Sequence, residues 1–213
     1  MEKNNEYQNL VECFCGKVFY IKSLYYIQEE LFEKGNSELL KQTAPNFFSD
    51  LNLLIVNNII LEMAKITDPS VDTKGNNNLS ISNIIESIEW SPEVKDKLNN
   101  LNIFFIRFRK YINKARNKVI AHNDRNTYLK DISLGAFPLE DGAAFFDKII
   151  EFCGTCHEAV CGNILGDVYL GQSGDVLDLK KTLQKAIAFD KYLDVASIEE
   201  AMIIEKIFMD IAD

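Results

Sequence analysis

The sequence predicts an all-α protein, and three observations support this fold class. Apolar residues recur at helical spacing over long stretches of the chain. Glycine and proline are scarce, at 10 and 4 of 213 residues, so little in the composition interrupts long helices. Capping residues and prolines stand where several of these stretches begin. With 47% hydrophobic residues, the chain can bury the core of one domain.

The predicted helices follow from their start and stop signals. Gly35-Asn36 ends the first helix, and Asp68-Pro69 ends the second. Ser91-Pro92-Glu93 starts the longest helix, because it combines a cap, a first-turn proline and an acid at the positive end of the dipole. Short strands at 131–137 or 167–170 are an alternative within the connections. In chain order, the expected helices cover residues 6–34, 45–67, 80–88, 92–121, 138–164 and 176–191, with a last one from Ser197 nearly to the end.

The chain has no internal repeat and no linker long enough to separate two domains. We expect a helical bundle over residues 1–170 and a C-terminal helical extension of the same domain over 171–213. Residues 166–175 are the best candidate for a hinge between them. Residues 70–78 and 123–137 have the polar composition of surface loops.

Charge is distributed very unevenly along the chain. The net charge of −9 and the pI near 4.9 argue against non-specific binding of nucleic acid, which needs a basic surface. Residues 103–125 nevertheless hold seven cations against Asp124 alone, a net charge of +6, which leaves −15 on the rest of the chain. Such a concentration of cations indicates a local anion-binding surface.

The location of the protein follows from two further features. We see no apolar run that approaches the ~18 residues of a membrane helix, and no hydrophobic signal segment near Met1. The expected location is therefore cytoplasmic, without a membrane partner. The five cysteines are then expected to be reduced.

One segment carries the residues for chemistry, namely the end of the predicted helix 92–121. Arg116 can clamp a phosphate, and His122 can exchange a proton near neutral pH. Together they are sufficient for phosphodiester chemistry without a metal. Six residues are ~600° of rotation on an ideal helix, so the two side chains would face ~120° apart. They converge only if the helix unwinds or if a second subunit contributes.

A plainer interpretation of the same segment is also open. Cations and histidine are favoured at helix C-termini, where they meet the negative end of the dipole. Asn123-Asp124 is ordinary turn chemistry. The interleaved aromatics Phe104, Phe105, Phe108 and Tyr111 are expected to pack in a core or dimer interface rather than to stack on bases.

The segment from Arg116-Asn117-Lys118 to Ala121-His122-Asn123-Asp124 resembles the motif of HEPN-type ribonucleases. The order of the preceding segments is similar to the abortive-infection, AbiU-type branch. A helix ends in Ile66-Thr67-Asp68-Pro69-Ser70, a polar loop follows, and Asn78-Leu79-Ser80-Ile81 opens a short helix. The resemblance spans roughly residues 40–165.

This resemblance implies an antiparallel helical bundle that dimerises through its long helices and cleaves RNA without metal or cofactor. His122 would be the general base on the ribose 2′-hydroxyl, Arg116 would stabilise charge on the phosphorus, and Asn117 would orient the site. The expected products carry a 2′,3′-cyclic phosphate and a 5′-hydroxyl. An antitoxin protein is a further possible partner. The cations expected to bind RNA are Arg109, Lys110, Lys114, Lys118 and Arg125.

A dimer is also expected on chemical grounds. Such cleavage needs a base and an acid, and the segment has one histidine, so a second copy of His122 would have to come from a partner protomer. Many HEPN domains bind rather than cut, so a non-catalytic module that binds RNA, a nucleotide or a protein is the alternative.

A third hypothesis is a metal or redox protein built on the cysteines. Cys153-Gly154-Thr155-Cys156-His157 matches the C-x-x-C-H pattern, and Cys13 and Cys15 could complete a zinc site. We expect instead that Cys153 and Cys156 are core residues on a helix face. The loop 68–78 resembles a calcium loop only superficially, because its glycine is misplaced and its last position lacks a glutamate.

Overall fold

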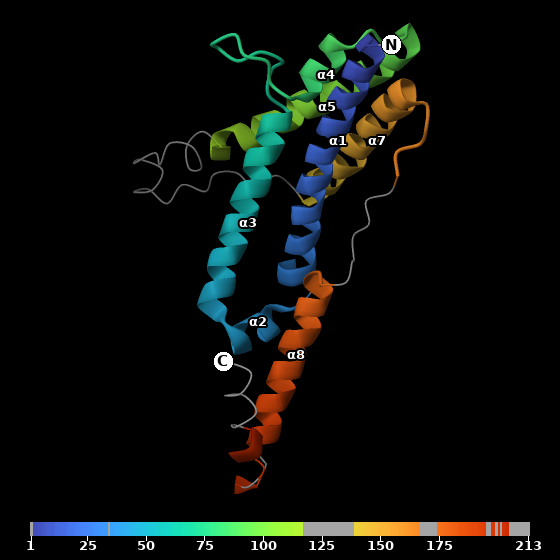
Figure 1. The fold of residues 1–213 in the computed structure, drawn as a ribbon. Coiled ribbons are helices and arrows are strands. Elements are labelled where there is room, and N and C mark those ends of the chain that lie inside the picture. The colour runs from blue at the N-terminus through green and yellow to red at the C-terminus, as the bar shows by residue number, and fades with distance from the viewer. Residues whose placement is uncertain are drawn as a thin grey trace. The chain divides into compact units, whose positions relative to one another are not determined.

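The protein is all-α, as the sequence predicts, and its elements are seen in the computed structural model (Figure 1). The structure describes residues 2–33, 35–116, 139–166 and 174–194, together with 197, 198, 200 and 202–204. Within these residues the only β-type pairing is an isolated bridge between Val71 and Asn77. The elements are α1 (Glu2–Gln28), a π-helical turn η1 (Glu29–Glu33), α2 (Ser37–Thr43), α3 (Pro45–Ile66), α4 (Ile81–Ser87), α5 (Pro92–Ala115), α7 (Leu139–Cys161) and α8 (Val176–Leu193).

The predicted helices that begin before residue 190 are present, and one described helix was not predicted. The last predicted helix, from Ser197, lies mostly outside the described residues. Between Gly35 and Pro45 the chain forms the short helix α2, which has no side-chain cap at Asn36 and buries Leu40. A seven-residue helix with one buried apolar position has too little periodicity to predict from sequence. The end of the helix expected over 92–121, the loop 123–137 and both candidate strands lie wholly or partly outside the described residues.

Short polar side chains start three of the helices. The hydroxyl of Ser80 accepts from the backbone N–H of Asn83 at the start of α4, and the hydroxyl of Ser91 accepts from the N–H of Val94 at the start of α5. The carboxylate of Asp175 accepts from the N–H of Leu177 at the start of α8. These caps satisfy backbone donors that the first helical turn leaves free.

The chain divides into two compact units. The first comprises residues 1–26 and 53–169, and the second comprises residues 27–52 and 170–213. Helices α1 and α3 each contribute residues to both units. The division predicted at residue 170 stays a prediction, as does the role of the C-terminal extension.

The first unit contains a large apolar core contributed by α1, α3, α4, α5 and α7. Helix α5 packs along α7 and also contacts α4. The ring of Phe105 lies edge-on to Phe145 at 5.5 Å and to Phe152 at 6.3 Å, and Phe152 lies edge-on to Phe14 of α1 at 5.7 Å. Edge-to-face contacts of this kind stabilise a core beyond simple burial. Of the four aromatics predicted to pack in a core or dimer interface, Phe105 and Phe108 are buried in this core, Phe104 packs against it, and Tyr111 is 49% exposed.

A buried carboxylate ties α1 to α3 in the same unit. Glu62 is 5% exposed and forms ion pairs with Lys17 of α1 and with Lys65, one turn along α3. Burial alone would raise the pKa of Glu62, but the hydrogen bonds and charges of Lys17 and Lys65 outweigh it and lower the pKa below its ordinary value. Glu62, Lys17 and Lys65 thus form a polar clamp beside the apolar core.

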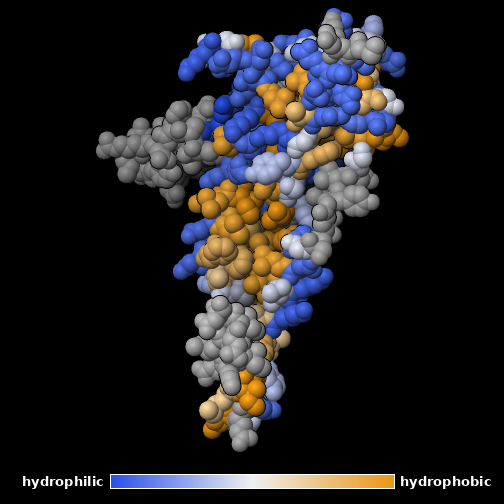
Figure 2. All heavy atoms as spheres, in the orientation of Figure 1, coloured by the Kyte–Doolittle hydropathy of each residue, from blue (hydrophilic) through white to orange (hydrophobic). Residues whose placement is uncertain are grey.

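Helix α3 presents apolar side chains to solvent, and Figure 2 shows them as an orange surface. Phe47, Leu53 and Leu54 are all more than 60% exposed. By length and composition α3 is apolar enough to cross a membrane, and 28% of its most apolar window is buried in the structure. Core helices of soluble proteins pass the same test. Glu62 and Lys65, with their ion pairs, lie on this helix.

The second unit is built from η1, α2, the first residues of α3 and α8. Helix α8 packs on α2 and on η1. The ammonium group of Lys180 on α8 lies 3.4 Å from a carboxylate oxygen of Glu30, and both side chains are largely buried. The buried apolar side chains of this unit are Leu31, Leu40, Phe48 and Val176.

Candidate functional site

The C-terminal half of α5 brings three polar side chains to one face of the helix. Arg109, Asn113 and Arg116 follow one another at four and three residues, which is the spacing of neighbours along one side of an α-helix. Arg116 still has helical backbone angles, and its N–H donates to the carbonyls of Ile112 and Asn113. The two arginines are therefore stacked two turns apart on the same face.

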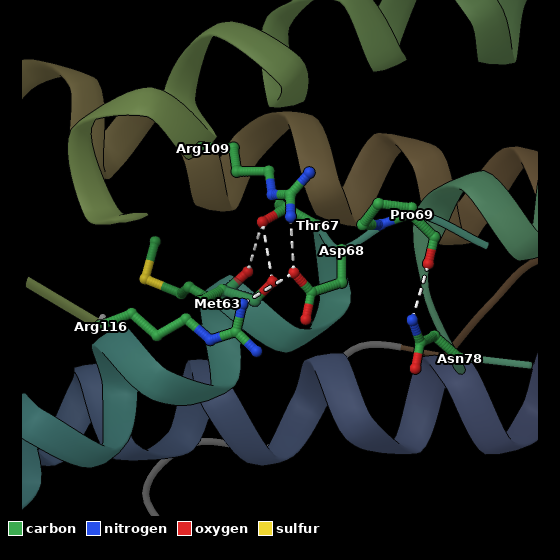
Figure 3. A network of polar contacts seen from close by, with 8 residues as sticks. Met63, Thr67, Asp68, Pro69, Asn78, Arg109 and Arg116 are labelled. Atoms are coloured by element: carbon green, nitrogen blue, oxygen red, sulfur yellow. Dashed lines mark hydrogen bonds and ion pairs between the residues drawn. The ribbon is translucent and has the colours of Figure 1, made fainter. Parts of the chain in front are cut away.

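Both arginines meet a single carboxylate, that of Asp68. Nη2 of Arg109 donates to Oδ1 of Asp68 at 2.8 Å, and Nη1 of Arg116 donates to the same oxygen at 3.0 Å (Figure 3). The side chain of Asp68 is 13% exposed, and those of Arg109 and Arg116 are 28% and 29% exposed. Ion pairs at this depth are screened less by solvent than those on the surface.

The two arginines leave a local excess of positive charge and of hydrogen-bond donors. Two guanidinium groups facing one carboxylate give the group a net charge of +1. Nε of Arg109 and Oδ1 of Asn113 are buried atoms for which no partner is found among the described residues.

The structure places only part of the predicted site. It brings Arg116 and Arg109 together, as their seven-residue spacing indicated, and it leaves Lys110 exposed. The side chain of Lys114 and the residues Asn117, Lys118, His122 and Arg125 lie outside what the structure describes. Their assignment as catalytic or RNA-binding residues stays a prediction.

Asp68 is the residue of this site that the sequence analysis did not select. There it served as a helix stop, as part of the resemblance and as the first residue of the loop that superficially resembles a calcium loop. One signal was available: an aspartate at the C-terminal end of a helix faces the negative end of the dipole, which is locally unfavourable. An aspartate at such a position is stabilised by cations from another element, and α5 supplies Arg109 and Arg116.

Three of the five cysteines have the environment of core residues. Cys15, Cys153 and Cys156 are buried, while Cys13 is exposed. A hydrogen bond with Cys153 lowers the pKa of Cys15, whereas burial raises the pKa of both Cys153 and Cys156. No group of three or more His, Cys, Asp or Glu side chains among the described residues is arranged to hold a metal ion.

Hydrogen bonds to Asp72 stabilise the loop that follows α3. One carboxylate oxygen of Asp72 accepts from the backbone N–H groups of Lys74 and Asn76, and the other accepts from the side chain of Asn76. The hydrogen bonds from Asn76 lower the pKa of Asp72. Gly75 takes a positive φ of 87° at the turn. These contacts account for the loop as a structural turn.

The all-α architecture is that expected of a HEPN-like helical protein. The HEPN AbiU2 family model matches residues 4–179, so the chain belongs to the AbiU2 family of abortive-infection HEPN proteins. The match extends beyond the segment 40–165 in which the resemblance was first seen. No curated protein matches the chain, and neither does any solved structure.

Proposed function

We propose that the protein is a metal-independent RNA endonuclease that acts as a homodimer in phage defence or as a toxin. The observation that carries the proposal is the arginine of the family motif, Arg116, held half-buried on Asp68 beside a second arginine. A fixed guanidinium is suited to stabilise negative charge that develops on a phosphate. The basic stretch 103–125 in an acidic chain supports an anionic substrate.

The proposed reaction is an internal transfer within RNA. His122 takes the proton of a ribose 2′-hydroxyl, and the 2′-oxygen attacks the adjacent phosphorus. The bond from phosphorus to the 5′-oxygen breaks, and this oxygen takes a proton from the second His122 of the dimer. Arg116 stabilises the charge on the phosphorane, and Asn117 orients the phosphate. The products are a 2′,3′-cyclic phosphate and a 5′-hydroxyl.

The outer face of α5 supports the dimer. Ile103 and Ile106 are 51% and 54% exposed, and their three-residue spacing places them on one helix face. Exposed isoleucines on a long helix lose unfavourable solvent contact when a second copy covers them.

The second candidate function is a non-catalytic module that binds RNA, a nucleotide or a protein partner. One observation favours it: Asp68 already neutralises part of the charge of Arg116. In a purely binding protein this ion pair is structural, and the remaining cations of α5 make the contacts with the ligand.

Cleavage of RNA in excess chelator tests the proposal. Purified wild type, Arg116→Ala and His122→Ala are incubated with total bacterial RNA, and the new ends are analysed for cyclic phosphate. Lys95→Ala is the matched control, because it removes an exposed cation from the other half of α5. We expect cleavage by wild type and control and none by the two site variants. Binding by a dimeric wild type without cleavage contradicts the nuclease and supports the second function.

A further inference from the structure

Asp68 lies just after the C-terminal end of α3, where the helix dipole disfavours an acidic side chain. Its backbone N–H still bonds to the carbonyl of Lys65, so it belongs to the C-terminal turn that follows α3. The unpaired carbonyls of a helix C-terminus repel a carboxylate. The compensating charges are Arg109 and Arg116 of α5, which come 41 and 48 residues later in the chain.

The backbone on both sides of Asp68 is fixed by hydrogen bonds. The hydroxyl of Thr67 donates to the carbonyls of Met63 at 2.9 Å and Ala64 at 3.1 Å. On the other side, the side-chain amide of Asn78 donates to the backbone carbonyl of Pro69 at 2.8 Å (Figure 3). The ring of Pro69 removes further freedom. The carboxylate therefore projects from a rigid base.

Arg109 and Arg116 then stand in different relations to this carboxylate. Arg109 lies well inside α5, and its Nε is buried. Arg116 caps the C-terminal end of α5, where its backbone N–H donates to the carbonyls of Ile112 and Asn113. Its Nη1 donates to Oδ1 of Asp68, which uses one of the five N–H donors of the guanidinium group.

We propose that Asp68 is a positioning residue, held in place by Arg109, which fixes the guanidinium of Arg116 for the reacting phosphate. This inference rests on the proposed nuclease function and adds two residues to it. Arg109 fixes the position of the Asp68 carboxylate, and this carboxylate fixes the position of the Arg116 guanidinium group. An arginine fixed in advance loses little conformational freedom when the substrate arrives. Asp68 itself does not touch the substrate.

The kinetic test separates positioning from RNA binding. A misplaced catalytic group costs up to about a hundredfold in rate. For Asp68→Asn we expect kcat to fall about ten- to a hundredfold, with the Kd for RNA within about threefold of wild type. Asp68→Glu restores part of kcat. Asp72→Asn is the matched control, because it removes a partly exposed carboxylate of the adjoining loop that does not contact either arginine, and its kcat stays unchanged.

A double-mutant comparison tests whether Arg109 acts on Arg116 through Asp68. If Arg109 acts through Asp68, Arg109→Gln lowers kcat in the same direction, and the double variant Arg109→Gln/Asp68→Asn is no slower than Asp68→Asn alone. All rates are taken well below the melting temperature of each variant. Additive losses, a wild-type kcat in Asp68→Asn, or a loss confined to RNA affinity each overturn the proposal.

A chemical test does not depend on cleavage and separates this inference from the nuclease itself. Phenylglyoxal modifies accessible guanidinium groups, and mass spectrometry reads each arginine. Arg107 is exposed and serves as the internal reference. In wild type we expect slow labelling of Arg109 and Arg116, and in Asp68→Asn a several-fold faster labelling of Arg116. Unchanged labelling of Arg116 overturns the positioning role, whereas absent cleavage with the expected labelling overturns the nuclease alone.

Discussion

Replacement of Glu62 by glutamine gives the sharpest prediction on stability. The side chain of Glu62 is 7% exposed, and its partners Lys17 and Lys65 are 34% and 49% exposed. A hydrogen bond to a charged group contributes about 1.5–3 kcal/mol, and half-exposed lysines fall at or below the low end of that range. We therefore expect Glu62→Gln to lower the free energy of unfolding by about 1.5 kcal/mol, or about 3–6 °C in Tm.

The pH dependence of this loss has a definite sign. Because the pKa of Glu62 is lowered in the folded protein, its charged form stabilises the fold above the pKa of the unfolded chain, about 4.3. This contribution disappears as pH falls through the folded-state pKa. The stability difference between wild type and Glu62→Gln is therefore full at pH 7 and closes progressively below about pH 4.3.

Urea unfolding followed by circular dichroism at pH 7, 5, 4 and 3 measures this difference. Glu86→Gln is the control, because Glu86 is an exposed glutamate outside the clamp. We expect the control to track wild type at every pH. A difference that stays constant from pH 7 to pH 3, or one that Glu86→Gln reproduces, would refute the ion-pair argument.

Two further predictions concern the core and the thiols. Phe105→Ala removes a ring in contact with Phe145 and Phe152 and should lower the free energy of unfolding by about 3–5 kcal/mol in denaturant titration; a loss below 1 kcal/mol would contradict the packing. Alkylation with iodoacetamide under native conditions should modify exposed Cys13 first and Cys153 slowest, because burial raises the pKa of Cys153; equal rates by mass spectrometry would contradict its burial.

The fold was predictable from sequence because its signals are local. Ser91-Pro92 marks the start of α5 by cap and proline chemistry, and the apolar spacing of α1 and α7 is regular enough to identify each as a helix. Helix α2 was missed because it buries one apolar residue and has no side-chain cap, whereas α4, which is equally short, begins at the cap Ser80. The helical spacing of the aromatics of α5 indicated a core or dimer interface, and Phe105 and Phe108 lie in the core.

The site was predictable only where its geometry lies along one helix. Arg109 and Arg116 share a face because they are seven residues apart, and this follows from helical geometry alone. The contact with Asp68 joins residues 41 and 48 positions apart, so it depends on how α3 ends beside α5. No spacing rule relates two such helices in advance of tertiary packing.

The pairing with Asp68 also gives the cations of α5 two different roles in the proposed function. Arg109 and Arg116 share one carboxylate and are less than one-third exposed, so in the proposed nuclease they would contribute little to long-range attraction of RNA. The exposed Arg107 and Lys110 would meet the phosphate backbone first. If the proposal holds, we expect loss of an exposed cation to weaken RNA binding and flatten its salt dependence, and loss of Arg116 to lower the rate of the chemical step. The proposed anionic substrate is then compatible with an acidic chain, because only a short basic segment has to face the RNA.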